Sequence, residues 1–213
     1  MVDPYLRQSP LAHLHLDARA ANDADLVGAG LRLSERAHLG MINVRGVAAD
    51  PAFAPAFKKA TGVELPTAAN TTAGKADGVH AIWLGPDEWL VITPPGREHA
   101  LADKLRAATK ALHAAVTVTG EARTVIRVAG ANARDAIAKG CPLDLHPRVF
   151  GPGQCGQTIL GRADMLIHQT ALDRKSGAPS YDVFVLRSFA EYAWTWLEDA
   201  GREYGVQVVA AKG

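Results

Sequence analysis

Several kinds of sequence signal are scarce in this chain, and each shortage excludes a class of protein. The formal net charge is only +1 over 213 residues. Charges of both signs are mixed along the chain, so there is no basic stripe to bind the phosphates of a nucleic acid. No apolar run approaches the roughly 18 residues of a membrane-spanning helix, and the N-terminal sequence MVDPYLRQSP does not resemble a secretory leader. We therefore expect a soluble, cytoplasmic protein that binds neither nucleic acid nor membranes.

Cysteine is equally scarce, since the chain contains only Cys141 and Cys155. In a reducing cytoplasm we expect both to be free thiols. Structural zinc sites usually bring their ligands as close pairs, and Cys141, His146, Cys155 and His168 contain no such pair, so the sequence predicts no metal site. A catalytic thiol needs a base and a lowered pKa, whereas Cys141 before a proline is typical of a small apolar side chain at a helix end.

The segment 140–160, GCPLDLHPRVFGPGQCGQTIL, combines both cysteines with the glycine spacing of a dinucleotide-binding loop. The three glycines of that spacing are Gly151, Gly153 and Gly156. A dinucleotide fingerprint requires a strand before it and a helix after it, so that the phosphate meets a helix N-terminus. Here Pro152 lies inside the motif and a strand is predicted to follow it. We interpret the segment as a shaped connection that braces the fold or a subunit contact.

The first half of the chain shows a β-α-β-β-α-β pattern. Strands are predicted at 41–44, 79–84, 89–93 and 116–118, from short apolar runs bounded by turn residues. A helix is predicted to begin after Asp50 and Pro51 and to end at Gly62. A second helix is predicted from apolar residues at helical spacing between Leu101 and Leu112.

The second half repeats this pattern. Strands are predicted at 123–128, 157–160, 165–169, 181–186 and 206–209, with a helix at 132–139. A second helix is predicted to start at a capping box formed by Ser188 and Glu191 and to end at Gly201. Its expected buried face consists of Phe189, Ala193, Trp196, Leu197 and Ala200. Gly46 and Gly130 occupy matching places after the first strand of each half.

These patterns predict an α+β fold made of two ferredoxin-like split β-α-β-β-α-β units packed in one body. The expected pseudo-repeats span residues 31–119 and 120–209, so that the body covers 31–209. Residues 1–30 form an N-terminal segment, in which His13 and His15 are expected on the solvated side of an edge strand, and 210–213 form a tail.

Tryptophan and histidine side chains are the candidates for contact with a partner protein. Trp83 and Trp89 flank a predicted hairpin, and Trp194 lies off the expected buried face of its helix. Together with His146, these residues are the predicted partner contacts, because aromatic residues carry much of the energy of protein interfaces. Packing inside the chain explains the tryptophans as well. No catalytic constellation is predicted, and the acidic pair at the hairpin tip is interpreted as a turn.

Long strings of the sequence resemble the γ subunit of heterotetrameric sarcosine oxidase. They are GEARTVIRVAGANARDAIAKGCPLDLHP from residue 120, FGPGQCGQTIL from residue 150, YDVFVLRSFAEYAWTWLEDAG from residue 181, and GPDEWLV at 85–91. The strings occur in the right order and cover most of residues 31–209. The resemblance is therefore much more specific than any single motif.

The resemblance implies a non-catalytic subunit of a complex that oxidatively demethylates sarcosine to glycine. In that family FAD, FMN and NAD belong to the larger α and β subunits, tetrahydrofolate binds to α, and zinc belongs to δ. The γ subunit itself holds no cofactor and packs mainly against α. The expected partners of this chain are therefore the α, β and δ subunits.

The resemblance also raises an alternative function, because the γ subunit is similar in fold to the folate-binding domain of glycine-cleavage aminomethyltransferases. This chain could then be a folate-binding module for one-carbon transfer. The aminomethyltransferases carry a Gly-Gly-Ile-x-Asp-Asp type segment before the strand that corresponds to 79–84, and here the sequence is Lys75-Ala76-Asp77-Gly78. Asp77 is the one folate candidate. Composition alone also allows a free-standing ferredoxin-like regulatory domain.

Overall fold

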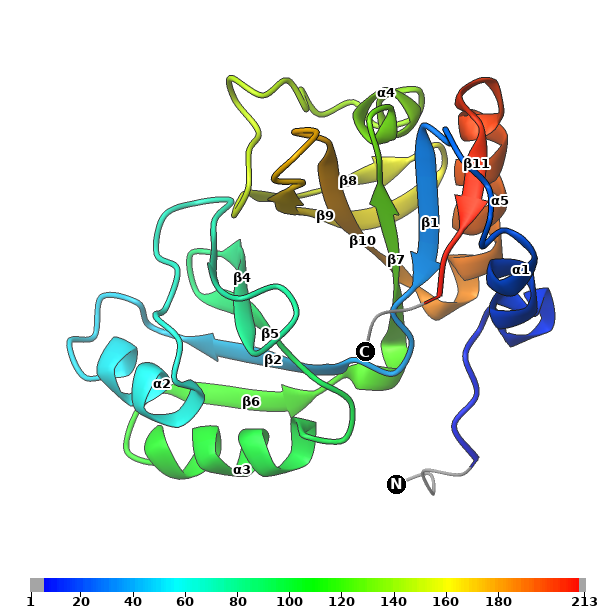
Figure 1. Ribbon diagram of the computed structural model, residues 1–213. Coiled ribbons are helices and arrows are strands. Elements are labelled where there is room, and N and C mark those ends of the chain that lie inside the picture. Colours follow the sequence, from blue (N-terminus) through cyan, green and yellow to red (C-terminus); the bar gives the residue numbers. More distant parts are fainter. Residues whose placement is uncertain (1–5, 211–213) are drawn as a thin grey trace. The chain divides into compact units, whose positions relative to one another are not determined.

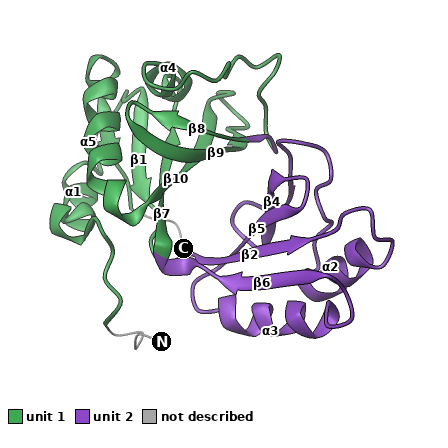
Figure 2. Cartoon of the chain, turned by 180° about the vertical axis from the view of Figure 1, so that it is seen from behind, with its two compact units in different colours: residues 1–38, 122–152, 156–212 green, residues 39–121, 153–155, 213 purple. Residues whose placement is uncertain are grey.

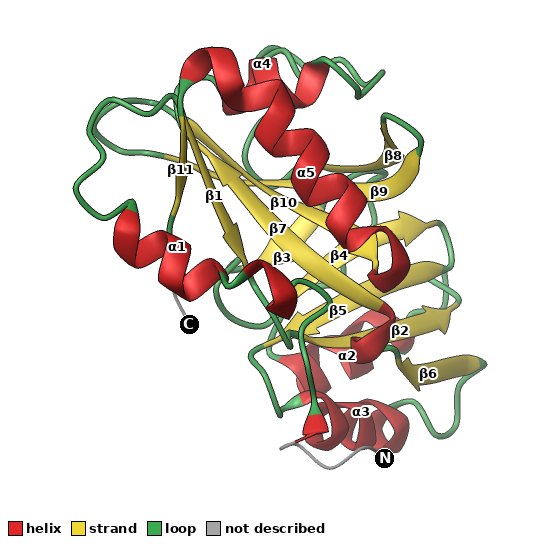
Figure 3. Ribbon diagram, turned by 90° about the vertical axis from the view of Figure 1, so that its right-hand side faces the viewer, coloured by secondary structure: helices red, strands yellow, loops and turns green. Residues whose placement is uncertain are grey.

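The computed structural model describes residues 6–210, which form two compact units (Figures 1 and 2). Unit 1 takes in the described residues up to 38, residues 122–152 and those from 156 onward. Unit 2 takes in residues 39–121 and 153–155. Each unit contains one β-sheet with helices on one of its faces (Figures 2 and 3). The predicted α+β class with two sheets is confirmed.

Unit 2 is built on a five-stranded sheet of order β3-β4-β5-β2-β6. Its elements are β2 (Gly40–Gly46), α2 (Phe53–Thr61), β3 (Thr72–Gly74), β4 (His80–Gly85), β5 (Glu88–Thr93), α3 (Glu98–Ala108) and β6 (Ala114–Val118). All of its paired strands are antiparallel. The predicted strands and helices of the first half are all present, and only the short strand β3 was not expected.

The core of unit 2 lies between α2, α3 and one face of the five-stranded sheet. Phe53 of α2 packs against Trp89 of β5, with ring centroids 5.5 Å apart. The indole N–H of Trp89 donates to the carbonyl of Pro66 at 2.7 Å, so the buried polar group is satisfied. The helix α2 ends at Gly62, whose φ of 74° is left-handed. The predicted stop signal at this glycine is confirmed.

Unit 1 is built on a six-stranded sheet of order β11-β1-β7-β10-β9-β8. Its helical elements are η2 (Ala12–Leu14), α1 (Leu16–Asn22), α4 (Ala133–Ala138), η4 (Arg187–Phe189), α5 (Ala190–Gly201) and η5 (Arg202–Tyr204), and η3 (Gly120–Ala122) precedes β7. Its strands are β1 (Leu31–Glu35), β7 (Arg123–Ala129), β8 (Cys155–Leu160), β9 (Ala163–Leu172), β10 (Pro179–Leu186) and β11 (Val206–Val208). Figure 3 shows α1, α4 and α5 on one face of this sheet.

The strand β1 gives the sheet of unit 1 an order that the repeat pattern did not predict. It lies between β11, to which it is parallel, and β7, to which it is antiparallel. Residues up to 38 therefore belong with the second half of the chain, whereas the sequence placed residue 31 at the start of the first repeat. Leu31 and Leu33 are buried and Arg32 is exposed, which is the alternation of a half-buried strand.

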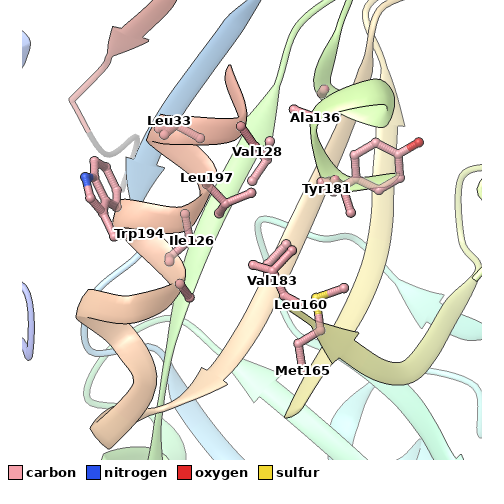
Figure 4. Close-up of a cluster of buried hydrophobic side chains, with 14 of the residues drawn as sticks. Leu33, Ile126, Val128, Ala136, Leu160, Met165, Tyr181, Val183, Trp194 and Leu197 are labelled. Atoms are coloured by element: carbon pink, nitrogen blue, oxygen red, sulfur yellow. The ribbon is translucent and has the colours of Figure 1, made fainter. Parts of the chain in front are cut away.

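The core of unit 1 lies between α4, α5 and the strands (Figure 4). In the figure, Leu33, Ile126, Val128, Leu160, Met165, Tyr181 and Val183 come from the strands, Ala136 from α4, and Trp194 and Leu197 from α5. These side chains come from seven elements, and β1 is far from the other six in the sequence. Formation of this core therefore requires β1 together with elements of the second half of the chain.

The buried face of α5 corrects the one expected from the sequence. It consists of Ala190, Ala193, Trp194, Leu197, Ala200 and Gly201. Phe189 is 40% exposed and Trp196 is only half-buried, so the two aromatic residues expected in the core lie at its margin. The predicted capping box is not formed, because Phe189 is the N-cap and no side chain caps the helix. The helix is thus rotated about its axis relative to the expected phase.

The N-terminal segment is folded onto unit 1. His13 lies in η2 and His15 adopts a left-handed conformation before α1, so the predicted edge strand is wrong. Leu11 is fully buried in the core of the unit, and Arg19 forms an ion pair with Glu198 of α5. Burial of apolar surface and this ion pair fix the segment to the unit.

A buried group of charges lies on the second face of the sheet of unit 1. Tyr181 and Val183 face the helices, so Asp182 between them points to the other face. Its carboxylate accepts hydrogen bonds from Arg36 Nη1 at 2.6 Å and from Arg127 Nε at 2.8 Å. Asp182 is 0% exposed. Arg127 of β7 and Arg36, which directly follows β1, thus form ion pairs with one acid that has no exposed surface.

Candidate functional site

The two fully buried tryptophans among the predicted partner contacts are core residues. Trp89 and Trp194 are both 0% exposed, the first in the core of unit 2 and the second in that of unit 1. A side chain with no exposed surface cannot meet a partner directly. This corrects the expectation for both residues, and packing inside the chain accounts for them.

The other two predicted partner contacts are accessible. Trp83 is half-buried on β4, where it is paired with Trp89 of β5. His146 is exposed in the connection between α4 and β8. Its Nδ1 accepts hydrogen bonds from the main-chain N–H and the Nε of Arg148, both at 3.2 Å, and its carbonyl accepts from Val149 and Phe150. His146 therefore organises the turn while its ring stays at the surface.

The glycine motif in 151–156 is a strand connection and not a phosphate-binding loop. The carbonyl of Gly153 accepts from the N–H of Thr72 at 2.8 Å, and the N–H of Cys155 donates to the carbonyl of Asn70 at 2.9 Å. These bonds extend the five-stranded sheet of unit 2 beyond β3. The strand β8 follows directly, as predicted, so no helix N-terminus is available at this motif.

Both cysteines are free and buried, as expected. The Sγ of Cys155 lies 3.5 Å from the carbonyl oxygen of Thr71 and 3.6 Å from that of Trp83. Burial raises the pKa of this thiol to about 12, and the hydrogen bond to Trp83 only partly offsets the shift. Within residues 6–210, no three His, Cys, Asp or Glu side chains are grouped closely enough to hold a metal ion.

We expect the Cys155 thiol to resist a disulfide-forming reagent in the folded protein, because its reactive thiolate is scarce at about pH 8. Its folded pKa lies above the ordinary value of 9.0, so its contribution to stability is complete below about pH 9. That contribution is lost as the pH rises from about 9 towards 12. The test uses a Cys141→Ala variant, in which Cys155 is the remaining thiol. The rate at which the reagent liberates its coloured thiolate, with and without denaturant, measures the reactivity of Cys155. Fast labelling of the folded variant at about pH 8 would contradict the expectation.

The three acidic residues considered for chemistry lie in an exposed loop or pair with neighbouring side chains. Asp77, the folate candidate, is exposed in the loop between β3 and β4. Asp87 at the hairpin tip forms an exposed ion pair with Arg45, and Glu88 accepts a hydrogen bond from Asn43 at 2.7 Å. Asp87 lies in the turn, as interpreted from the sequence, whereas Glu88 is the first residue of β5.

A groove that the sequence did not reveal lies in unit 1, beside the edge strand β8. It is lined by residues of β7, β8, β9 and β10, including the exposed apolar side chains of Ile159 and Leu186. The charged residues Arg123 and Asp164 also line it. The sequence shows only an apolar isoleucine in a strand without charged residues, and its exposure became apparent once the strand order was known.

The helices of residues 6–210 all lack the length or the apolar character needed to cross a membrane.

A profile of the sarcosine oxidase, gamma subunit family matches residues 45–203. The chain is 35% identical over 205 residues to sarcosine oxidase subunit gamma of Corynebacterium sp. (strain P-1), with 96% of this chain and 95% of the relative covered. It is also 35% identical over 205 residues to the subunit of the same name from Arthrobacter sp, with the same shares covered.

Solved structures give the same result. A chain of heterotetrameric sarcosine oxidase from Corynebacterium sp. U-96, in complex with pyrrole 2-carboxylate, matches with a TM-score of 0.82 and 33% identity over 98% of this chain and 99% of that chain. Glycine cleavage system aminomethyltransferase T from Bartonella henselae matches with a TM-score of 0.69 over 96% of this chain and 59% of that one. At 15% identity, the second match shows a shared fold alone. From the family profile, the curated relatives and the first solved structure, the chain belongs to the sarcosine oxidase gamma subunit family.

Proposed function

We propose that this chain is a non-catalytic subunit of a heterotetrameric oxidase that demethylates sarcosine to glycine, and that it packs mainly against the α subunit. The observation that carries the proposal is the match to a chain of heterotetrameric sarcosine oxidase, which covers nearly the full length of both chains. The match therefore concerns the whole chain and not a single segment of it. The chain then contributes surface to an assembly and not a reacting group.

The cofactors of the reaction are proposed to bind to the other subunits. FAD, FMN and NAD belong to α and β, tetrahydrofolate to α and zinc to δ in this proposal. The geometry of the chain supports it in two ways. The cysteine with the strongly shifted pKa is held in its protonated, unreactive form, and the glycine motif is used for main-chain pairing. The complex is proposed to work in the cytoplasm.

The fold is proposed to derive from two β-α-β-β-α-β pseudo-repeats of the ferredoxin-like split type. In unit 2 the strands β2, β4, β5 and β6 follow this pattern, with the helices α2 and α3 at the expected places. In unit 1 the strands β7, β9, β10 and β11 are the counterparts, and β1 is inserted before the last of them. The two units differ by the internal strand β1 and by the edge strand β8 in unit 1, and by the edge strand β3 in unit 2.

Co-expression with the other three subunits tests the proposed function. A tagged chain is expected to retain α, β and δ in stoichiometric amounts through size-exclusion chromatography, and flavin absorbance should appear in this complex. The chain purified alone should show no flavin absorbance and no binding of tetrahydrofolate in calorimetry. A wild-type chain that fails to retain the other subunits would contradict the proposal.

The folate-binding alternative has a distinct outcome in the same experiment. Tight, stoichiometric binding of tetrahydrofolate by the isolated chain, abolished in Asp77→Ala, would establish it. Asp87→Ala is the matched control, because Asp87 is also an exposed acid at a turn of unit 2. Loss of binding in both variants would point to an effect of net charge and not to a site at Asp77.

A further inference from the structure

The outer side of helix α5 in unit 1 is uncovered and hollowed. Figure 3 shows α5 in front of the sheet, with no other described element over its outer side. The described residues that line the hollow, which we call the α5 groove, come from the helix and from η4 and η5 at its ends. They are Ser188, Glu191, Tyr192, Thr195, Trp196, Glu198, Asp199 and Arg202.

The lining residues recur at the spacing of a helix-packing surface. Within α5, Glu191, Thr195 and Glu198 follow one another at intervals of four and three residues, so they lie in one row along the helix. The side chain of Thr195, in the middle of this row, is short and exposed. A short side chain at the centre of a helix face lets a second helix approach closely. The shape of the α5 groove therefore favours a helix as its occupant.

Aromatic side chains form one wall of the α5 groove. Tyr192 is 38% exposed and Trp196 is half-buried. The Oη of Tyr192 accepts a hydrogen bond from the main-chain N–H of Arg162 at 3.1 Å. The ring of Trp196 lies so close to Gly140 that a Cβ added there would be 2.3 Å from Cζ2 of the indole. Both rings are thus held in place before any partner arrives, and tyrosine and tryptophan are enriched at protein interfaces.

The other wall of the α5 groove is acidic. Three carboxylates line the groove against one guanidinium, so its formal charge is negative. Asp199 pairs with that guanidinium, which belongs to Arg202, at 3.3 Å. Glu198 pairs with Arg19 of α1, which lies outside the groove. These two carboxylates are engaged within the chain, and the excess negative charge therefore comes from Glu191.

Glu191 is the charge that a partner would meet. Its carboxylate lies 3.5 Å from Nε2 of His13, and a histidine is a cation only when its ring is protonated. No lysine or arginine within residues 6–210 pairs with it. Its side chain is 68% exposed, and Tyr192 lines the same groove. An arginine matches both residues, because its guanidinium pairs with carboxylates and stacks on aromatic rings.

We propose that the α5 groove binds an arginine-bearing amphipathic helix of a partner subunit of the oxidase. Arginine side chains of that helix pair with Glu191, and its apolar side chains cover the rings of Tyr192 and Trp196. Charge complementarity selects a basic partner, and the aromatic wall supplies the apolar area. This inference rests on the proposed function, because it assigns a surface of the chain to a subunit contact.

The first test reverses the charge at Glu191. Glu64→Arg is the matched control, because Glu64 forms an exposed ion pair with Lys58 in unit 2 and its side chain is also 68% exposed. Each variant is co-expressed with the wild-type chain and the other three subunits, and the complex is purified through a tag on α. Mass spectrometry measures the ratio of variant to wild-type chain in the complex, relative to that in the lysate. We expect this ratio to fall about tenfold for Glu191→Arg, which would face arginines, and to stay unchanged for Glu64→Arg.

A second variant keeps the inference testable if Glu191→Arg disturbs the first turn of α5. Thr195→Arg places a large cation at the centre of the α5 groove. Thr195 is exposed and its hydroxyl forms no hydrogen bond in the described part of the chain, so the melting temperature of the isolated variant should stay close to that of the parent. Its incorporation into the complex should also fall about tenfold.

The possible outcomes separate this inference from the proposed function. Incorporation of either folded variant at the wild-type level would overturn the inference, and so would an equal loss for Glu64→Arg. Retention of the other subunits by the wild-type chain would still support the proposed function in those cases. If the isolated wild-type chain dimerises and Thr195→Arg makes it monomeric, the occupant is a second copy of the chain and the inference is wrong.

Discussion

Replacing Asp182 by asparagine should destabilise the protein by about 3–5 kcal/mol, which is the usual cost of removing one partner from a buried ion pair. The carboxylate is fully buried and forms ion pairs with Arg36 and Arg127, and Arg36 is itself 8% exposed. An amide has no charge and can accept at only one oxygen, so the two guanidinium groups lose the negative charge of Asp182 and one of its two acceptor oxygens. Denaturant unfolding followed by circular dichroism measures the loss.

The matched control is Asp87→Asn at the exposed ion pair with Arg45. Both side chains of that pair are more than half exposed, so water screens the charges and the expected loss is less than about 1 kcal/mol. Equal losses of unfolding free energy in the two variants would show that the buried ion pairs of Asp182 stabilise the protein no more than the exposed pair of Asp87. The idea of a neutralising acid in the unit 1 sheet would then have to be abandoned.

Replacing Gly130 by alanine should cost roughly 2–5 kcal/mol, from backbone strain and overpacking together. Its φ of 129° is a conformation that side-chain-bearing residues rarely adopt. An added Cβ would lie 2.3 Å from the carbonyl oxygen of Gly30, which is a main-chain atom and cannot rotate away. That carbonyl also accepts a hydrogen bond from the N–H of Asn132, so its displacement disturbs the turn before α4.

Gly62→Ala separates the two causes. Gly62 also has a positive φ, 74°, but an added Cβ would have no neighbour within 4 Å. Strain alone is expected there, at about 1–2 kcal/mol. If chemical denaturation shows the same loss for Gly130→Ala as for Gly62→Ala, the close approach of residues 30 and 130 contributes nothing to the requirement for glycine.

Most of the regular structure could be predicted from local patterns. The strands and helices from residue 40 to residue 118 have apolar periodicity and clear stop signals such as Gly62, and they are present where expected. The strand β1 was missed because its neighbours are distant in the sequence, with Leu31 paired to Val206. A segment of five residues carries too little local signal to identify a partner 175 positions away.

The candidate site was harder to predict because it depends on which side chains reach the surface. The sequence identified Trp194 as a surface candidate, and a small error in helix phase separates that position from the core. The acid in the strand YDVFVL was available as a signal, since a charge inside an otherwise apolar strand needs a partner. Its partners, Arg36 and Arg127, became apparent only when the strand order was known.

The position of β1 determines where the chain can be divided into separate fragments. A fragment that stops at residue 119 would contain β1 without β7 and β11, the two strands that flank it in the sheet. The complementary fragment would contain β7 and β11 with an empty place between them. The internal repeat visible in the sequence therefore does not supply two independent modules. The pieces that correspond to whole sheets are separated at residues 38 and 122, and one of them is assembled from both ends of the chain.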